Sequence, residues 1–551
     1  MSVSNLKVLI LDDSNVVISS VRGMLSRIGF SERNIAFSQS PKNGIALAKK
    51  ELFDVIICDY NFYSTLDGKQ VFEEMKHFDC LKSDSIFVVI TGDSSLETVN
   101  SLIDLEPDDY LLKPFNQEFL RKRVISGVER KRAMKGIYIA RDRGDFEIGV
   151  QECDKLLPFF PQYYNYIMKE KGRFYRLMKL WNQAKEFYKS LLNHNDSDWV
   201  VLGLSNSMKN LGELEEARKL VNSIIERSPN NINAIKEMAS IDLHSNKIPD
   251  SIKNIKLVNS LTKGSSEREL VISNLSLSVG DYRESFNFYK KYYNLNRDTF
   301  RDDLWMKLNL VRRMLMFFTR DSQETISLVM IESSVLELVS IEDRSESWKI
   351  NVDILTSHLL LLQGKFEEFL GLLNSSYRDL LSSVNSNLFH FYDILYFVWL
   401  LSYCSYDKES QEMSVILAKS FKKSIVQNKN DINSEIILDS MKALLEQSID
   451  LERVKRDWLD ERYQVLQGLN MNESLPIYIE ISQRYPTLVS VRTKIVEHLG
   501  DVWPEGLGKT QTKRLLKQSD DVVRQLSDRD YLEVIKYDCC YQKALSTISR
   551  V

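Results

Sequence analysis

Between Lys7 and Phe115, short runs of apolar residues alternate with longer segments of helical periodicity. In the first of these longer segments, Val16 to Ile28, apolar residues recur every three or four positions, as they do on one face of a helix. The alternation predicts a parallel sheet of five strands covered by helices, the fifth of which follows Pro114. The predicted strands are Val8–Leu11, Ile35–Phe37, Val55–Cys58, Ile86–Ile90 and Tyr110–Leu112.

After Asn116 the alternation of strand and helix patterns stops, and helical periodicity continues to the end of the chain. Between Ile137 and Leu295 a turn-like triplet recurs with a period of about 34 residues. A mostly small residue stands five positions after each turn, where two helices have to approach closely. The turns begin at Gly144, Lys179, Gly212, Lys247 and Gly280, and the residues five positions on are Gly149, Ala184, Ala217, Ile252 and Ser285.

This period is typical of the tetratricopeptide repeat, whose unit is a hairpin of two helices. Pro161 and Pro229 lie where the second helix of a unit should end. Beyond Arg301 the turns become irregular, and we expect further helix pairs there, including helices at Ser322–Leu338 and Asp431–Leu445. The predicted organisation is an α/β domain (1–125), a linker or extension of its fifth helix (126–136), repeats (137–300) and a divergent all-helical region (301–551).

Composition and charge narrow the class of protein. The chain has 73 basic and 77 acidic residues among 551, which does not favour nucleic acid or an anionic membrane as the main partner. The basic segment Arg121–Lys135 is interpreted as a solvated helix face rather than a nucleic-acid contact. The six cysteines show no metal or redox spacing, and we expect them to be small buried side chains. The longest apolar run, Ile394–Cys404, is too short to cross a membrane and is interpreted as a buried core helix. We expect a cytoplasmic protein.

Ionisable and polar residues stand at the ends of four of the predicted strands. Asp12 and Asp13 follow the first, Asp59 the third, Thr91 the fourth and Lys113 the fifth. The carboxyl ends of parallel strands meet at one edge of the sheet, so these side chains should converge on one pocket. Three carboxylates held together require a neutralising cation, and hard oxygen ligands favour Mg²⁺.

The residue types in this pocket indicate a separate chemical role for each side chain. Asp13 and Asp59 can supply oxygen ligands to Mg²⁺, Asp12 can hold a metal-bound water, and the main-chain carbonyl of Asn61 can complete the set. The carboxylate of Asp59 can then act as a nucleophile toward phosphorus. Lys113 and Thr91 would balance the charge that develops on the phosphoryl oxygens.

The segments Leu11–Ser14, Cys58-Asp59, Thr91-Gly92 and Asp108–Phe115 resemble the receiver domains of bacterial two-component response regulators. The resemblance covers about a fifth of the chain. It implies a flavodoxin-like (βα)5 fold with strand order 2-1-3-4-5, magnesium as the cofactor and Asp59 as the residue phosphorylated by a histidine kinase. It also implies a cis peptide bond before Pro114.

The resemblance further gives Tyr110 the role of an aromatic switch residue that moves when Thr91 shifts toward the phosphate; a half-buried tyrosine at a sheet edge is the alternative. Phe62-Tyr63-Ser64 departs from the family, where a methionine-proline pair is usual. Asn61 and Asp93 flank the expected phosphoryl position and are candidates for tuning the access of hydrolytic water.

We therefore predict a response regulator of a phosphorelay that is not an enzyme, apart from the phosphorylation and dephosphorylation of its own receiver. Its output would be protein binding by the tetratricopeptide-like repeats, with the histidine kinase or another response regulator as a possible partner. An enzymatic or nucleic-acid-binding output hidden in the helical region is the alternative. Gly506–Thr510 resembles part of a nucleotide-binding loop, but the leading glycine is replaced by Trp503.

Overall fold

The computed structural model of the chain describes residues 3–62, 66–194, 196–320, 326–343, 345–383, 388–427 and 435–550. These residues form two compact units. The first comprises Met1–Ile272, Lys291–Asp303 and Lys429–Ile436, and the second comprises Ser273–Lys290, Leu304–Asn428 and Ile437–Val551.

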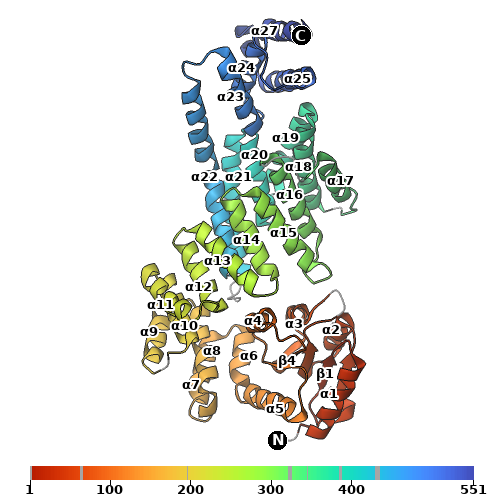
Figure 1. Cartoon of the computed structure of the whole chain (residues 1–551), viewed down its shortest axis with the longest axis vertical. Coiled ribbons are helices and arrows are strands. Elements are labelled where there is room, and N and C mark those ends of the chain that lie inside the picture. Colours follow the sequence, from red (N-terminus) through yellow and green to blue (C-terminus); the bar gives the residue numbers. More distant parts are fainter. Residues whose placement is uncertain are drawn as a thin grey trace. The chain divides into compact units, whose positions relative to one another are not determined.

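The first unit begins with a five-stranded parallel sheet, in which Figure 1 labels β1 and β4. Its strand order is β2-β1-β3-β4-β5, which confirms the predicted α/β fold class. β3 is the central strand and β1 lies beside it, with Leu11 of β1 in register with Cys58 of β3. The residues that follow these two strands therefore emerge side by side. The strands are β1 (Val8–Leu11), β2 (Ile35–Ser38), β3 (Phe53–Asp59), β4 (Leu81–Thr91) and β5 (Asp109–Leu112).

Helices cover both faces of this sheet, because the central strands are apolar on both sides. On one face Ile10, Ile57 and Val88 pack against α1 and α5, and on the other face Leu9, Ile56 and Phe87 pack against α2, α3 and α4. The helices are α1 (Asn15–Ile28), α2 (Pro41–Lys50), α3 (Gly68–His77), α4 (Leu96–Leu105) and α5 (Gln117–Ala133).

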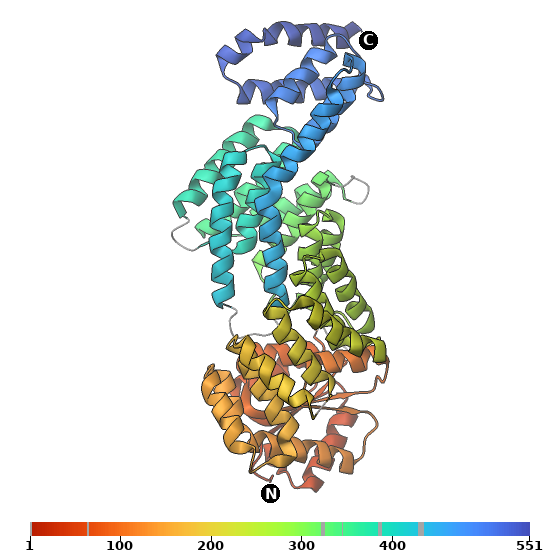
Figure 2. The same ribbon diagram turned by 90° about the vertical axis from the view of Figure 1, so that its left-hand side faces the viewer.

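Beyond α5 the described chain is helical and folds into successive antiparallel hairpins, coloured orange to green in Figure 2. Each turn contains a residue with positive φ at one of the predicted positions or next to it: Gly144, Lys179, Gly212, Asn246 and Gly280. The helices are α6 (Lys135–Arg143), α7 (Phe146–Leu156), α8 (Tyr164–Leu177), α9 (Trp181–Leu192), α10 (Asp198–Asn210), α11 (Leu214–Arg227), α12 (Ile232–His244), α13 (Ile248–Leu261), α14 (Ser266–Ser278) and α15 (Tyr282–Asn296).

Small residues at the expected positions allow these helices to approach closely. A Cβ added to Gly149 would lie 2.4 Å from the ring of Phe174 on the next hairpin. Ala184 and Ala217 are fully buried, and the hydroxyl of Ser205 donates a hydrogen bond to the carbonyl of Ala217. The regular period in the sequence therefore corresponds to regular hairpins.

Among the helices after Asp303, those from Met471 onward pack around an apolar core of their own. The helices before them share a larger apolar core, which includes most of the run Ile394–Cys404 in α20, as predicted. His358 is buried in this core and hydrogen bonds with Tyr396 and Thr319. The helices are α16 (Leu304–Arg320), α17 (Leu328–Val339), α18 (Glu346–Gln363), α19 (Phe366–Ser383), α20 (Phe391–Tyr403), α21 (Asp407–Gln427), α22 (Glu435–Leu466), α23 (Met471–Arg484), α24 (Val489–Leu499), α25 (Lys509–Leu526), α26 (Arg529–Val534) and α27 (Tyr537–Arg550).

Two predicted helices differ from the structure at their ends. The helix expected from Ser322 begins at Leu328, because the hydroxyl of Ser327 accepts a hydrogen bond from the N–H of Met330 and caps it; residues 321–325 lie outside the described residues. The helix expected at Asp431–Leu445 is described from Glu435 and continues to Leu466.

Two expectations about side chains also need correction. The cysteines are not all buried, because Cys539 is exposed. The basic end of α5 is not wholly solvated, since Lys131 is buried and pairs with Asp108 at 2.9 Å.

Within the described part of the chain, no helix combines the length and apolar character that a membrane crossing requires.

Candidate phosphoacceptor site

Asp59 ends β3 and lies at the carboxyl edge of the sheet, where it is only 6% exposed. Its Oδ1 atom accepts a hydrogen bond of 2.9 Å from the N–H of Tyr60. Gly68, the first residue of α3, packs directly on this strand end and donates its N–H to the carbonyl of Tyr60 at 2.9 Å. Strand end and helix start are thus held together around the carboxylate.

Asp12, Asp13 and Lys113 converge on Asp59, as the sequence predicts. One oxygen from each of Asp12, Asp13 and Asp59 can be chosen so that all three lie within 4.8 Å of one another. The Lys113 Nζ atom lies 2.7 Å from Asp12 Oδ2 and 3.2 Å from Asp59 Oδ1. The other oxygen of Asp12 accepts a hydrogen bond from the N–H of Ser14, the cap of α1.

Burial and neighbouring charges shift the protonation equilibria of this pocket. Burial raises the pKa of the Asp59 carboxyl, Lys113 opposes that rise and the negative charge of Asp12 adds to it. Burial alone would lower the pKa of Lys113, but its hydrogen bond to Asp12 and the charges of Asp59 and Asp12 outweigh this effect and raise it. Both Asp59 and Lys113 therefore hold their protons more strongly in the folded protein than in an unfolded chain.

The residues present fit a divalent cation. The site offers carboxylate oxygens, which are ligands that Mg²⁺ prefers, and Asp12 is fully buried within it. Among the described residues, Asp12, Asp13 and Asp59 form the one group of three or more acidic, histidine or cysteine side chains close enough to share a metal ion. Asn61 lies at the start of the β3–α3 loop, two residues after Asp59.

Thr91 ends β4 and is fully buried, and its carbonyl accepts a hydrogen bond of 2.7 Å from the N–H of Lys113. The Thr91 hydroxyl accepts a hydrogen bond of 3.1 Å from the N–H of Asp93. The Asp93 carboxylate accepts hydrogen bonds from Thr98 Oγ1 and Ser95 N at the start of α4. These bonds hold the pKa of Asp93 well below its usual range, so that it is an anion at neutral pH.

The Lys113–Pro114 peptide bond is cis, as the resemblance implied. Tyr110 is half-buried and packs beside the apolar cluster on the α2–α4 face of the sheet, which both interpretations of this residue allow. Of the unusual segment Phe62-Tyr63-Ser64, Tyr63 and Ser64 lie outside the described residues.

Sequence reasoning missed two residues of the site. Gly68 carries no catalytic group, and its close contact with β3 becomes visible only in three dimensions. Lys263 lies far along the chain in the α13–α14 connection, yet its ammonium group is 3.2 Å from Asn61 Oδ1. No motif in the sequence pointed to this lysine.

We expect Gly68→Ala to damage the site without touching any charged residue. A Cβ at position 68 would lie 2.3 Å from the carbonyl oxygen of Asp59 and 2.8 Å from Cα of Tyr60, so the backbone has to move. The free energy of unfolding should fall by about 1–3 kcal/mol, and phosphorylation should slow. Denaturant unfolding and phosphorylation by a small phosphodonor measure the two effects.

Gly92→Ala is the matched control, because a Cβ there meets nothing within 4 Å. Equal behaviour of the two alanine variants would contradict the steric explanation.

Comparisons with known proteins find similarity in the N-terminal part of the chain. Residues 8–125 match the family model of the response regulator receiver domain. The chain is 25% identical over 131 residues to the chemotaxis protein CheY-3 of Vibrio cholerae, an alignment covering 23% of this chain and 94% of that protein.

Among solved structures, the chemotaxis response regulator CheY4 of Vibrio cholerae is 25% identical to this chain, with a TM-score of 0.20. The match covers 22% of this chain and 98% of that chain. A CheY-like receiver domain protein from Methanospirillum hungatei is 22% identical with a TM-score of 0.21, and the match covers 23% and 98% of the two chains.

The N-terminal domain is therefore a response regulator receiver domain, a phosphoacceptor module of two-component signalling. These matches cover about a fifth to a quarter of the chain and do not extend to the helical region that follows.

Proposed function

We propose that this protein is a response regulator of a phosphorelay, phosphorylated on Asp59 by a histidine kinase. The observation that carries the proposal is the convergence of Asp12, Asp13, Asp59 and Lys113, from the ends of three strands, on one buried pocket. A structural salt bridge would need one acid per lysine. Three acids gathered beside one lysine fit a site built to receive a cation and an anionic phosphoryl group.

The chemistry of the step follows from the positions of the side chains. Both recorded contacts of the Asp59 carboxylate use Oδ1, so Oδ2 is the atom that we expect to attack phosphorus. As the new O–P bond forms, the bond between phosphorus and the donor nitrogen breaks and the donor retains the electron pair. Lys113 and the Thr91 hydroxyl would stabilise negative charge on the phosphoryl oxygens.

Magnesium would be held by Asp13, Asp59 and the main-chain carbonyl of Asn61, with Asp12 binding a metal-bound water. When bound, the cation supplies neutralising charge for the acids and for the incoming phosphoryl group. Lys113 keeps its proton throughout this step, because its neighbours raise its pKa. Tyr110 and Pro114 would then transmit the change at Thr91 to the surface of the domain.

For the rest of the chain we propose a protein-binding output. The hairpins from residue 137 to about 300 would be tetratricopeptide-like repeats, and 301–551 a divergent continuation, with 126–136 joining them to the receiver. Stacked hairpins offer an extended surface suited to a peptide or a helix.

The partner would be a component of the same pathway, either the kinase or another response regulator, and the proposed location is the cytoplasm. The layout resembles that of the VieB protein of Vibrio.

The proposal predicts that phosphorylation changes what the full-length protein binds. Wild-type and Asp59→Ala protein, each treated with Mg²⁺ and acetyl phosphate, would serve as baits in a cell extract, with untreated protein beside them. We expect one partner whose recovery changes several-fold on treatment of the wild type and stays constant for Asp59→Ala. Mass spectrometry identifies the retained protein.

Recovery that is the same for all four baits, or no retained protein at all, would contradict a phosphorylation-dependent binding output. A partner that changes with treatment of both wild type and Asp59→Ala would show that acetyl phosphate acts elsewhere.

A further inference from the structure

The receiver domain is docked on helices of its own compact unit through the outer surfaces of α3 and α4. On α3, Gln70 donates its side-chain N–H to the carbonyl of Leu295 at 2.8 Å, and Glu73 pairs with Arg301 at 2.7 Å. On α4, Asn100 donates to the carbonyl of Leu261 at 3.0 Å. These contacts bring the α13–α14 connection to the edge of the sheet where Asp59 lies.

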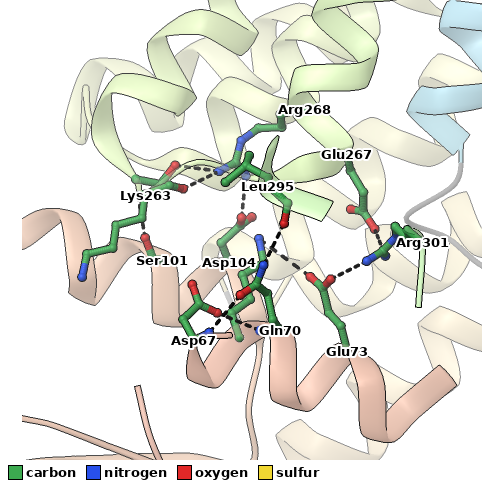
Figure 3. Close-up of polar contacts among 12 residues, drawn as sticks. Asp67, Gln70, Glu73, Ser101, Asp104, Lys263, Glu267, Arg268, Leu295 and Arg301 are labelled. Carbon is green, nitrogen blue, oxygen red and sulfur yellow. Dashed lines mark hydrogen bonds and ion pairs between the residues drawn. The ribbon is translucent and has the colours of Figure 1, made fainter. Parts of the chain in front are cut away.

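At the centre of this contact is Asp104 of α4, which Figure 3 shows below Arg268 of α14. Asp104 pairs with Arg268 and with Lys236, the latter at 2.8 Å. Burial alone would raise the pKa of Asp104, but these two cations outweigh it and hold that pKa well below its usual range. A largely buried carboxylate with two cationic partners is a specific contact, because breaking it leaves an unpaired charge.

The same arginine fixes the connection that carries Lys263. The Arg268 guanidinium donates to the hydroxyl of Thr262 at 2.7 Å and to the carbonyl of Lys263 at 3.3 Å. The N–H of Lys263 donates to the hydroxyl of Ser101 on α4 at 2.7 Å. Figure 3 shows the Lys263 side chain extending away from Arg268, on the side of Ser101. Its backbone is thus held at both the N–H and the carbonyl.

The ammonium group of Lys263 lies between the two loops that flank the phosphoacceptor. It is 3.2 Å from Asn61 Oδ1, two residues after Asp59, and 3.4 Å from Asp93 Oδ2, two residues after Thr91. It also lies 4.9 Å from the centre of the ring of Tyr60, whose N–H binds Asp59. A cation in contact with the amide of one loop and the carboxylate of the other joins them across the site.

From this geometry we propose that Lys263 is a positioning residue of the phosphoryl site, contributed by the helical region. The inference rests on the proposed phosphorylation of Asp59. Water has to reach phosphorus roughly opposite the Asp59 oxygen, between the β3–α3 and β4–α4 loops. By holding Asn61 and Asp93 together, Lys263 narrows this approach and lengthens the life of the phosphorylated state.

The test is the rate of loss of the phosphoryl group from full-length protein. Wild type, Lys263→Met, Lys263→Gln and Lys263→Arg are phosphorylated with Mg²⁺ and acetyl phosphate, the donor is removed, and the phosphorylated fraction is followed by intact-protein mass spectrometry. We expect hydrolysis about three- to tenfold faster for Met and Gln, since each loses the charged hydrogen bonds to both loops. Lys263→Arg keeps a cation with several donors and should restore the wild-type rate.

Lys253→Met is the matched control, because Lys253 is an exposed lysine on the adjacent helix α13. It should hydrolyse at the wild-type rate. Thermal unfolding of every variant checks that the fold is retained. If the role of Lys263 were purely structural, the neutral variants would unfold at a lower temperature, and Lys263→Arg would behave like Lys263→Met.

The outcomes separate the two proposals. Equal lifetimes for all variants, slower hydrolysis without Lys263, or a failure of both neutral variants to accept the phosphoryl group would overturn the role given to Lys263 and leave the phosphorylation of Asp59 standing. Absence of phosphorylation on wild-type Asp59 would instead overturn the proposed function.

Discussion

Asp59→Asn is expected to abolish phosphorylation of the chain by acetyl phosphate and Mg²⁺, leaving no detectable gain of a phosphoryl group in intact-protein mass spectrometry. Asparagine keeps the size of the side chain and the oxygen that accepts the N–H of Tyr60. It replaces the carboxylate nucleophile with an uncharged amide that does not attack phosphorus. Lys113 would retain its 2.7 Å ion pair with Asp12, so the pocket should stay assembled.

The matched control is Asp54→Asn, which changes the same residue type at the opposite end of β3. Asp54 pairs with Lys82 at 2.6 Å and takes no part in the pocket. This variant should accept a phosphoryl group as the wild type does. A wild-type chain that stays unmodified, or an Asp59→Asn chain that is modified to the same extent, would refute the assignment of the phosphoacceptor.

Asp59→Asn should also change how the free energy of unfolding depends on pH. Because the pKa of Asp59 is raised on folding, ionisation of this carboxyl costs the folded state, and without Mg²⁺ the wild type loses stability as pH rises from about 4 through the folded pKa. Asp59→Asn removes this loss and should be more stable than the wild type at pH 7 in the absence of Mg²⁺. The raised pKa of Lys113 stabilises the fold throughout this pH range, and this contribution is lost only as pH rises above its ordinary value of 10.5.

Thermal melts from pH 4 to 8 in a chelating buffer would measure this difference. A wild type whose stability relative to Asp59→Asn is constant over that range would contradict the electrostatic account of the pocket.

The receiver fold was predictable because its local pattern and its topology agree. Strands buried on both faces form continuous apolar runs, so β1 was predicted with its correct ends and β3 within two residues of them. Asp12, Asp59 and Lys113 follow different strands, and parallel strands place their carboxyl ends together whatever the sequence between them. The convergence of these residues could therefore be predicted from the fold class alone.

Contacts between distant segments were not predictable in this way. Lys263 reaches Asn61 because α4 docks on the α13–α14 connection, and that docking depends on Asp104, Arg268 and Ser101, none of which belongs to a sequence pattern. Helical periodicity shows which face of a helix is apolar, but it does not show which other helix covers that face. For the same reason the hairpins were predictable from their period, while the packing of the helices after residue 303 was not.

Buried charges in the helices after residue 303 were also not predictable from the sequence. Arg312 of α16 and Asp393 of α20 are 81 positions apart in the chain, and both are almost completely buried. No pattern in the sequence indicates that these two residues pair. In the structure they form an ion pair of 2.7 Å, and Arg312 also donates hydrogen bonds to Asn309 and Asn351.

Arg312→Met is expected to cause the largest loss of stability among these variants, about 3–5 kcal/mol in the free energy of unfolding, because it leaves the carboxylate of Asp393 buried without its cation. Methionine fills much of the volume of the arginine side chain, so the loss should come mainly from charge and not from a cavity. Urea unfolding followed by circular dichroism measures the effect, and hydrogen exchange of α16 and α20 shows whether the loss is local to these helices.

A double variant distinguishes the unpaired charge from other causes. The Asp393 carboxylate accepts a hydrogen bond of 2.8 Å from the N–H of His390 at the start of α20. Asp393→Asn removes the negative charge but keeps an oxygen that can accept this bond. Arg312→Met/Asp393→Asn should therefore recover at least half of the stability lost in Arg312→Met. An exposed arginine, Arg453, pairs with Asp450 three positions earlier in α22, and Arg453→Met should cost less than about 0.5 kcal/mol. A double variant no more stable than Arg312→Met would mean that the arginine acts through its packing and its bonds to the two asparagines instead of through the charge of Asp393.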